Sequence, residues 1–286
     1  MKHGNHISTA RTHRLWHVLA ELSTPKWQRT PGRILVALLL SLAASTGHTQ
    51  APQKDTVATR KYSVALGFQK KKLFDQAAQR WQQFIKDYPK NKRVPTAYHH
   101  LGVCQIQSQN FVEAAGAFRT LLSKFPQFPA RDSAQFNLAM ALYNAALAST
   151  KPADFNAAAA GFATVIAQYG KSPLVDQSLY YQAECLCLAE KQSEAVPVYE
   201  KLIAQFPKSS LLNQAHYSLA ATLQELKKEE PAATVLATFL TRFPKDPLIP
   251  DVQLRLGLSL FNQGKFAESE PLFVQAASSK EYPHAD

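Results

Sequence analysis

The order of apolar and polar residues between positions 97 and 126 follows the period of an α-helix twice. The first pattern has steps of three, one and three and consists of Tyr98, Leu101, Gly102 and Gln105. The second has steps of four and three and consists of Ala114, Phe118 and Leu121. Asn110 and Phe111 interrupt the two patterns, and Phe125-Pro126 ends the second, because proline lacks an N–H and disfavours helical geometry before it. The segment predicts two amphipathic helices joined by a short turn.

Three marks of this helical hairpin recur along the chain. A small residue of the first helix recurs at steps of 37 residues, with one step of 44: Ala65, Gly102, Ala139, Ala183, Ala220 and Gly257. A small residue of the second helix recurs in phase: Ala77, Ala114, Ala158, Ala195, Ala232 and Ser269. Four residues later comes a large apolar side chain: Trp81, Phe118, Phe162, Tyr199, Leu236 and Phe273. The register predicts an all-α array in which each unit buries its apolar face against its neighbours.

The unit resembles the tetratricopeptide repeat (TPR). The family's signature positions correspond to Tyr98, Leu101, Gly102, Gln105, Ala114, Phe118, Leu121 and Pro126. Gln105 replaces an aromatic residue and Leu121 replaces alanine. The resemblance covers residues 58–281 and implies a right-handed superhelical solenoid of about six helix-turn-helix hairpins. Units of 37 residues that close with an aromatic residue and proline resemble the bacterial envelope subgroup, which includes BamD-like outer-membrane assembly lipoproteins and the Tol-Pal-associated periplasmic coordinator.

The third unit carries seven extra residues. Its two small marks, Ala139 and Ala158, are 19 residues apart, whereas the corresponding residues of the other units are 12 apart. Residues 147–154, LASTKPAD, have the Ser, Thr, Pro and Asp that are typical of a loop. We expect this insertion to lengthen the turn between the two helices.

Residues 1–51 have the layout of a secretory signal peptide with a long basic n-region. A basic stretch ends at Arg33, and the apolar run ILVALLLSLAA, residues 34–44, is followed by small and polar residues. We expect cleavage between Thr46 and Ala51, followed by a linker over residues 52–57. The sequence therefore predicts an exported, periplasmic protein.

Two observations limit how such a protein could be held at a membrane. The apolar run has eleven residues, whereas a transmembrane helix needs about 20. The nearest cysteine after the run is Cys104, so lipid anchoring through an N-terminal cysteine, as in the assembly lipoproteins, is not expected. Peripheral membrane association stays open.

The net charge of +11 is unevenly distributed. Residues 54–93 hold eleven Lys and Arg against three acids, whereas residues 94–286 hold fifteen against seventeen. The basic excess therefore lies in the leader and the first repeat. No nucleic-acid-binding signature accompanies it, and we expect no nucleic-acid partner.

The candidate chemistry is sparse. We find no Gly-rich phosphate loop, no G-x-S-x-G, no H-E-x-x-H and no C-x-x-C. His99 and His100 are adjacent and diverge on a helix, so they are not expected to share a metal ion. Cys104, Cys185 and Cys187 are expected to be small buried apolar residues rather than a disulfide or metal site. We expect no enzymatic activity, no cofactor, no metal and no small-molecule substrate.

The first helices of such hairpins are expected to line the concave side of the array. The residue after the first signature position is aromatic or histidine in five of six units: Tyr62, His99, Phe136, Tyr180, Tyr217 and Leu254. Two turns later on the same face come Gln69, Ile106, Tyr143, Cys187, Gln224 and Phe261. Rings with a polar tip are common at binding surfaces, so we expect Tyr62, His99, Phe136, Tyr143, Tyr180 and Tyr217 to bind a partner, with Tyr180 and Tyr217 at least partly exposed. The alternative is ordinary packing between repeats.

Two functions follow as hypotheses. The first is a non-enzymatic scaffold of the cell envelope that binds a protein or peptide on its concave face, in outer-membrane assembly or Tol-Pal-type coordination. The alternative is a structural module that docks to an anionic surface through its basic first repeat. The aromatic-proline mark recurs at Tyr282-Pro283, so residues 282–286 are expected to begin a further repeat of a longer protein.

Overall fold

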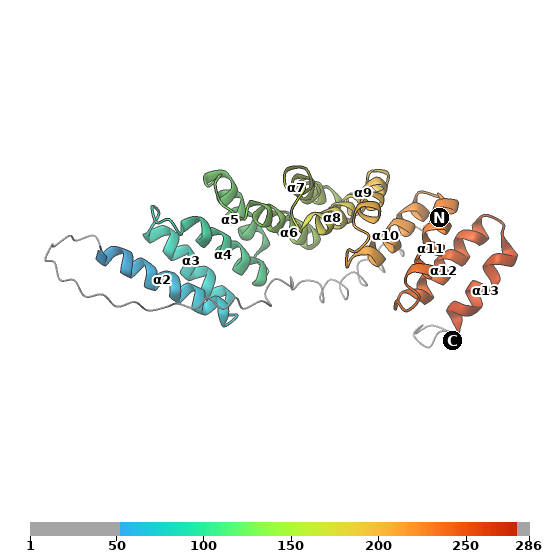
Figure 1. The fold of residues 1–286 in the computed structure, drawn as a ribbon, viewed down its shortest axis with the longest axis horizontal. Helices are drawn as coiled ribbons and strands as arrows, with labels where there is room; N and C mark the ends of the chain where they lie inside the picture. Colours follow the sequence, from blue (N-terminus) through green and yellow to red (C-terminus); the bar gives the residue numbers. More distant parts are fainter. Residues whose placement is uncertain (1–51, 279–286) are drawn as a thin grey trace. The chain divides into compact units, whose positions relative to one another are not determined.

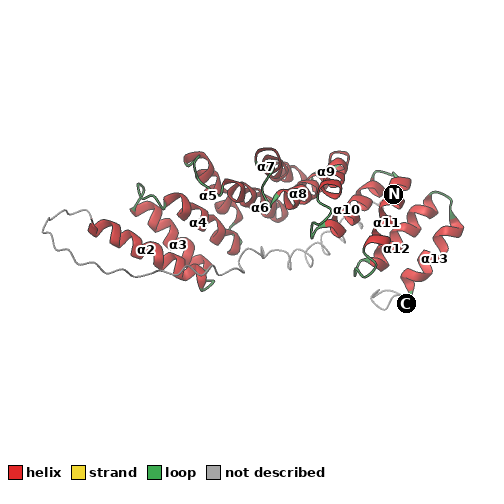
Figure 2. Cartoon of the chain, in the orientation of Figure 1, coloured by secondary structure: helices red, strands yellow, loops and turns green. Residues whose placement is uncertain are grey.

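The computed structural model describes residues 52–278, which belong to the compact unit Gln50–Asp286. Apart from one 3-10 turn, η2, all regular elements in this range are α-helices (Figure 2). Their bounds are α2 Pro52–Lys70, α3 Phe74–Asp87, α4 Val94–Gln107, α5 Phe111–Lys124, α6 Arg131–Ser149, η2 Pro152–Asp154, α7 Phe155–Gln168, α8 Val175–Leu188, α9 Gln192–Gln205, α10 Leu212–Glu225, α11 Glu229–Arg242, α12 Ile249–Asn262 and α13 Phe266–Ala277.

These helices form six consecutive hairpins, from α2–α3 to α12–α13, and each helix packs against the next along the chain (Figure 1). The first helices of neighbouring hairpins are also in contact: α4 touches α6, and α8 touches α10. The predicted all-α solenoid is confirmed for residues 52–278. The signal peptide predicted over residues 1–51 and the further repeat predicted at residues 282–286 lie outside the described residues.

The repeated marks are the core of each hairpin. The small residues of the second helices are buried in all six hairpins, and five of them have no exposed surface: Ala77, Ala114, Ala158, Ala195 and Ala232. The large side chains four residues later are fully buried in the first five hairpins: Trp81, Phe118, Phe162, Tyr199 and Leu236. Small residues let the two helices of a hairpin approach, and the large side chain fills the space beside them.

Gly102 shows how close this approach is. A Cβ atom added to Gly102 would lie 2.5 Å from the ring of Phe118, so any larger residue would force this ring to shift. Gly257 has the same relation to Phe273, at 2.6 Å. Glycine in the first helix is thus matched to phenylalanine sixteen residues later.

The turn inside each hairpin ends the first helix in the same way. In the turn that follows each first helix, a single residue has a left-handed backbone, with φ between 57° and 77°: Lys72, Gln109, Thr150, Glu190, Lys227 and Gly264. In five of the six turns, all but the one after α6, the N–H of the following residue then bonds back onto the helix, as that of Leu73 does to the carbonyl of Phe68 at 3.0 Å. Only one of the six is glycine, the residue that favours this region.

A second recurring contact joins the first helix to the loop that closes the same hairpin in three consecutive hairpins, from α6–α7 to α10–α11. Ser172 Oγ donates to Asp132 Oδ2 at 2.6 Å, and Ser209 Oγ donates to Asp176 Oδ2 at 2.7 Å. In the next hairpin Asn213 and Asp246 exchange the roles of donor and acceptor, also at 2.6 Å. These bonds hold the connection to the following hairpin.

Two expected boundaries differ from the structure. The insertion does not simply lengthen the loop, since α6 continues to Ser149 and has 19 residues where α4 and α8 have 14. Only residues 150–154 connect α6 to α7, and they include η2. The extra residues are rich in alanine, which favours helix over loop. Residues 52–57, expected as a linker, are the start of α2.

Candidate functional site

The candidate site is the first-helix face, defined as the two rows of residues expected to line the concave side: Tyr62, His99, Phe136, Tyr180, Tyr217, Leu254, Gln69, Ile106, Tyr143, Cys187, Gln224 and Phe261. The structure divides this face into three stretches. Its centre, on α6 and α8, is closed by packing. The first stretch, on α2 and α4, and the last, on α10 and α12, are partly exposed.

In the central stretch the aromatic side chains are buried. Phe136 is 8% exposed, Tyr143 2% and Tyr180 4%. The expectation that Tyr180 would be partly exposed is therefore wrong. The reason is the bulk of the neighbouring rings: Tyr180 contacts Tyr181 and Tyr199 at centroid distances of 5.5 and 6.3 Å.

The central stretch also contains a buried carboxylate, that of Glu184. Glu184 on α8 is 2% exposed and accepts a hydrogen bond from the hydroxyl of Tyr199. Burial, together with the nearby charge of Glu184, holds the pKa values of Tyr143 and Tyr199 well above their usual range and raises that of Tyr181 to about 12. The hydroxyls therefore stay protonated and can donate to the carboxylate.

The position of Glu184 is apolar in the other repeats, which have Leu66, Val103, Met140, Ala221 and Leu258 there. A carboxylate in an otherwise apolar row is visible in the sequence, but neither the aromatic rows nor the catalytic motifs point to it. Glu184 is too deeply covered to meet a partner directly, so its role is to fix the packing of the central tyrosines.

In the first stretch, rings pack edge to face but leave polar atoms unpaired. Tyr62 lies 4.8 Å from the ring of Trp81, and the guanidinium of Arg93 lies 5.2 Å above it. His99 packs against Phe118 and Phe128 at 5.8 and 5.7 Å. Its Nε2 atom is buried and has no hydrogen-bond partner among the described residues. Such an atom costs free energy unless water or a partner meets it.

The two adjacent histidines are neutral at pH 7. Burial lowers the pKa of His99, and burial together with the neighbouring His99 lowers that of His100 to about 4. His100 stacks on Trp81, with centroids 4.9 Å apart and planes at 12°. No group of three or more His, Cys, Asp or Glu residues within residues 52–278 is arranged to hold a metal ion.

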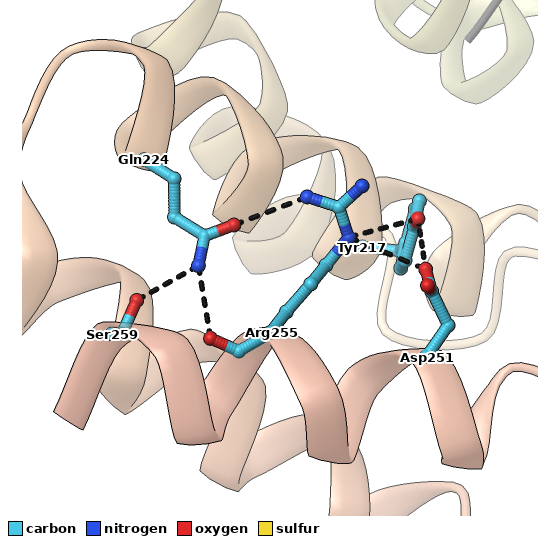
Figure 3. Close-up of polar contacts among 5 residues, drawn as sticks. All are labelled: Tyr217, Gln224, Asp251, Arg255 and Ser259. Carbon is cyan, nitrogen blue, oxygen red and sulfur yellow. Dashed lines mark hydrogen bonds and ion pairs between the residues drawn. The ribbon is translucent and has the colours of Figure 1, made fainter. Parts of the chain in front are cut away.

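The last stretch carries a hydrogen-bonded network between α10 and α12 (Figure 3). The hydroxyl of Tyr217 donates to Asp251, and Arg255 Nε donates to the hydroxyl oxygen of Tyr217 at 2.9 Å. The guanidinium lies 4.9 Å from the Tyr217 ring centroid. Arg255 Nη1 donates to Gln224 Oε1 at 3.1 Å, and Gln224 Nε2 donates to the Ser259 hydroxyl at 2.8 Å.

Tyr217 is half-buried, so the expectation of partial exposure is confirmed for this residue. Burial raises its pKa to about 12, which keeps the hydroxyl a donor to Asp251. The Arg255 side chain keeps 32% of its surface exposed. Its guanidinium is held by Tyr217, Asp251 and Gln224 on one side, which leaves a fixed, partly exposed cation that suits a carboxylate. The sequence signal for this site is the i, i+4 pair of Asp251 and Arg255, which the rows of aromatic residues do not include.

The three cysteines are buried and free, as expected. Cys104 and Cys185 have no exposed surface, and burial raises the pKa of Cys104 to about 12. Cys187 Sγ lies 3.3 Å from the hydroxyl of Thr222 on the next first helix. These side chains fill space between repeats.

Basic side chains of the first repeat are exposed: Arg60, Lys61, Lys70, Lys71, Lys72, Arg80, Lys86, Lys90 and Lys92. Of these, Lys61 forms an ion pair with Asp87 at 2.8 Å. Within residues 52–278 no helix has the length and apolar character needed to cross a membrane.

Comparison with protein-family models finds tetratricopeptide repeats at residues 65–129 and 177–209. Among solved structures, a tetratricopeptide repeat protein from Parabacteroides merdae ATCC 43184 is similar over 77% of this chain and 78% of its own, with 14% identity and a TM-score of 0.56. The MamA protein is similar over 65% of this chain and 91% of its own, with 15% identity and a TM-score of 0.54. A search of curated proteins found no significant match.

The chain therefore contains tetratricopeptide repeats at residues 65–129 and 177–209, and its described part has the fold of a tetratricopeptide-repeat superhelix. Proteins of this class are in general scaffolds without catalytic activity, which bind protein or peptide partners. The identity to the solved structures is too low to carry more than the fold.

Proposed function

We propose that this chain is a non-enzymatic scaffold of the bacterial cell envelope that binds a protein or peptide partner on its first-helix face. The fold supports the scaffold role, since TPR domains in general bind such partners. The observation that carries the proposal is the division of the first-helix face. Its closed centre separates two partly exposed stretches that offer different chemistry to a bound segment.

The first stretch would take an apolar segment. Leu66, Val103 and Ile106 are half-buried, and Tyr62 and His99 lie beside them on the same helices. The last stretch would take a carboxylate, because Arg255 is held in place and partly exposed.

This arrangement can be tested with a photo-crosslinking amino acid at Ile106 on α4. Arg119, exposed on the second helix of the same hairpin, is the matched control position. The proposal expects a crosslinked partner from Ile106 and none from Arg119. Equal labelling at both positions, or none at either, contradicts it.

The envelope location rests on the apolar run after Arg33, which lies outside the described residues. We expect the mature chain to begin between about residues 44 and 52 and to fractionate with the periplasm. Mass determination of the N-terminus tests this, and a cytosolic protein that retains Met1 contradicts it. Outer-membrane assembly and Tol-Pal-type coordination are the processes to which the repeat length points.

The exposed basic side chains of the first repeat favour a second candidate function, docking to an anionic surface of lipid headgroups or polymer. In that case binding to anionic vesicles should weaken strongly between about 0.05 and about 0.5 M salt, and K70E/K71E should weaken it further. Partner binding through the first-helix face should be much less sensitive to salt. The salt dependence therefore separates the two functions.

A further inference from the structure

The loops that connect consecutive hairpins share one backbone turn. These loops are residues 88–93, 125–130, 169–174, 206–211 and 243–248. In each loop the N–H of the fourth residue bonds to the carbonyl of the first, as that of Ser172 does to Tyr169 at 2.8 Å. The third residue is a central residue of this β-turn, and in four of the five loops it is an exposed lysine: Lys90, Lys171, Lys208 and Lys245.

Three of these lysines stand beside a residue that anchors the loop. The residue after the lysine bonds to a side chain of a first helix in three consecutive loops: Ser172 to Asp132, Ser209 to Asp176, and Asp246 to Asn213. The backbone of each lysine is therefore fixed relative to the array, and the positive charges form a row with one member per repeat.

The row lies at one edge of the array. Helices joined by short connections pack antiparallel, so the loops between hairpins lie at one edge and the turns inside hairpins at the other. We define the loop edge as the loops with the first three residues of each following helix: 88–96, 125–133, 169–177, 206–214 and 243–251. The turn edge is defined in the same way: 71–76, 108–113, 150–157, 189–194, 226–231 and 263–268.

The exposed charges of the two edges differ in sign. The turn edge has seven lysines against eight acids, and seven of these acids are exposed. The loop edge has seven Lys and Arg against four acids, and all four acids are half-buried and bonded to other side chains: Asp132, Asp176, Asp246 and Asp251. The charged side chains that the loop edge exposes are all lysines: Lys90, Lys92, Lys171, Lys208 and Lys245.

These five lysines have no ion-pair partner within residues 52–278. The helix ends that lead into the loops add to the excess, because Lys86, Lys124 and Arg242 are exposed there. Asp87, at the end of α3, is exposed as well, but it is in an ion pair with Lys61 at 2.8 Å.

The spacing of the lysines favours an extended surface over a peptide as the partner. Packed helices are about 8–10 Å apart, so lysines of successive loops are about 20 Å apart. This exceeds the screening length of about 8 Å at physiological ionic strength, so each lysine acts separately. A bilayer with anionic lipid presents negative charge to all of them without any register, whereas a peptide would have to space its acids to match.

We propose that the loop edge docks the array onto a bilayer that contains anionic lipid, with the row of lysines at the level of the headgroups. The turn edge then points away from the bilayer, because its exposed acids are repelled. The first-helix face lies between the two edges and stays open to a partner. This proposal goes beyond the second candidate function, which uses the first repeat alone.

Fluorescent labels at opposite ends of α9 test this orientation in the full chain. Ser210→Cys lies in a connecting loop and Ser193→Cys in the first turn of α9; both positions are exposed, and the three native cysteines are buried. Vesicles of phosphatidylcholine with about one third phosphatidylglycerol and a nitroxide on the headgroup should quench the label at residue 210 and not that at residue 193. Vesicles of phosphatidylcholine alone should quench neither. The basic leader is common to both chains, so the difference reports on the array.

Charge reversal at equal net charge identifies the lysines responsible. K171E/K208E/K245E should raise the lipid concentration for half-maximal quenching at residue 210 at least about tenfold. K191E/K228E/K265E reverses three exposed lysines at one repeat position of the turn edge, and this matched control should change it less than about twofold. Both variants change exposed side chains only and should melt with the unmodified chain.

Equal quenching at the two positions, no quenching at either, or equal effects of the two triple variants overturns the proposal. A label at residue 210 that responds to polyglutamate but not to anionic vesicles assigns the edge to an acidic polypeptide and also overturns it. Quenching that is lost in K70E/K71E but kept in K171E/K208E/K245E assigns docking to the first repeat, with the same consequence. None of these outcomes bears on crosslinking at Ile106, so partner binding and docking can fail separately.

Discussion

Tyr180 and Tyr217 occupy the same position in adjacent repeats but have different surroundings. Tyr180 is 4% exposed and lies among the rings of Tyr181 and Tyr199. Tyr217 is half-buried and hydrogen-bonded to Asp251 and Arg255 (Figure 3). The repeat places both side chains on the same face of a first helix. The residues of the neighbouring helices then decide whether that position is packing or surface.

The position one residue later shows the same difference. Tyr181 stacks on Phe162 of the preceding hairpin, with centroids 5.6 Å apart, and His100 stacks in the same way on Trp81. In the last hairpin the corresponding residue is Arg255, which reaches back to Tyr217 and Gln224 instead. The array is therefore held by stacked rings in its first and central junctions and by a charged network in its last.

The largest expected effect compares the two tyrosines directly. Tyr180→Ala should lower the free energy of unfolding by about 3–5 kcal/mol, because it leaves a large cavity among rigid rings. Tyr217→Ala should cost about 1–3 kcal/mol, since water can enter a half-buried site. Urea unfolding followed by circular dichroism measures both. Equal losses would mean that Tyr217 is as much a core residue as Tyr180.

The stacked histidine makes the first junction sensitive to acid. The pKa of His100 is about 4 in the folded chain against an ordinary value of 6.5. The unfolded chain takes up this proton as pH falls through 6.5, whereas the folded chain resists it, so stability falls between about pH 6.5 and 4, by up to about 3 kcal/mol.

His100→Tyr, which introduces the residue found at Tyr181, should remove this part of the pH dependence. A smaller part should remain, because burial also lowers the pKa values of His99 and His216. Unfolding free energies measured at pH 7 and pH 5 for the two chains test this. An unchanged difference in the variant would show that His100 is not the group responsible.

Removal of one tyrosine hydroxyl compares the buried carboxylate of Glu184, which is 2% exposed, with that of Asp251, whose side chain is 14% exposed. Tyr199→Phe removes a hydrogen bond to Glu184, where both side chains are fully buried, and should cost about 1.5–3 kcal/mol. Tyr217→Phe takes one from Asp251, whose surroundings are wetter, and should cost about 1 kcal/mol.

A double variant is the control for the central site. Glu184→Met with Tyr199→Phe removes both partners and introduces the residue found at Met140, so it should be more stable than Tyr199→Phe alone. A further loss of stability would show that Glu184 has a second essential contact. Urea unfolding again gives the comparison.

The smallest expected effect compares an interior junction with the last one. Gly102→Ala drives a methyl group into Phe118, which is fully buried, and should cost about 1–3 kcal/mol. Gly257→Ala meets Phe273 in the same way, but this ring is only half-buried and can move, so the cost should be below about 1 kcal/mol.

Gly116→Ala is the matched control for both, because an added Cβ meets nothing within 4 Å. It should raise stability by up to about 1 kcal/mol through helix propensity alone. Thermal unfolding of the three variants gives the order. If Gly102→Ala were as stable as Gly116→Ala, the close approach of α4 to Phe118 would be wrong.

The candidate site was less predictable than the fold. Tyr62, His99 and Tyr217 lie on a partly exposed face, whereas Phe136, Tyr143 and Tyr180, which share their repeat position or face, are buried. The spacing of residues along one helix reports which side of it they occupy. It does not report how large the side chains are that cover this side from the next repeat.

The sequence by itself determined the hairpins, their number within residues 52–278 and the residues at their cores. It could do so because two helices pack closely only where small residues such as Gly102 and Ala114 recur in register, and that register is local. Only the tertiary structure decided that α8 is closed and that Arg255 is held at the surface. These outcomes depend on contacts between helices of different repeats, and those contacts follow from which side chains the stacking brings together.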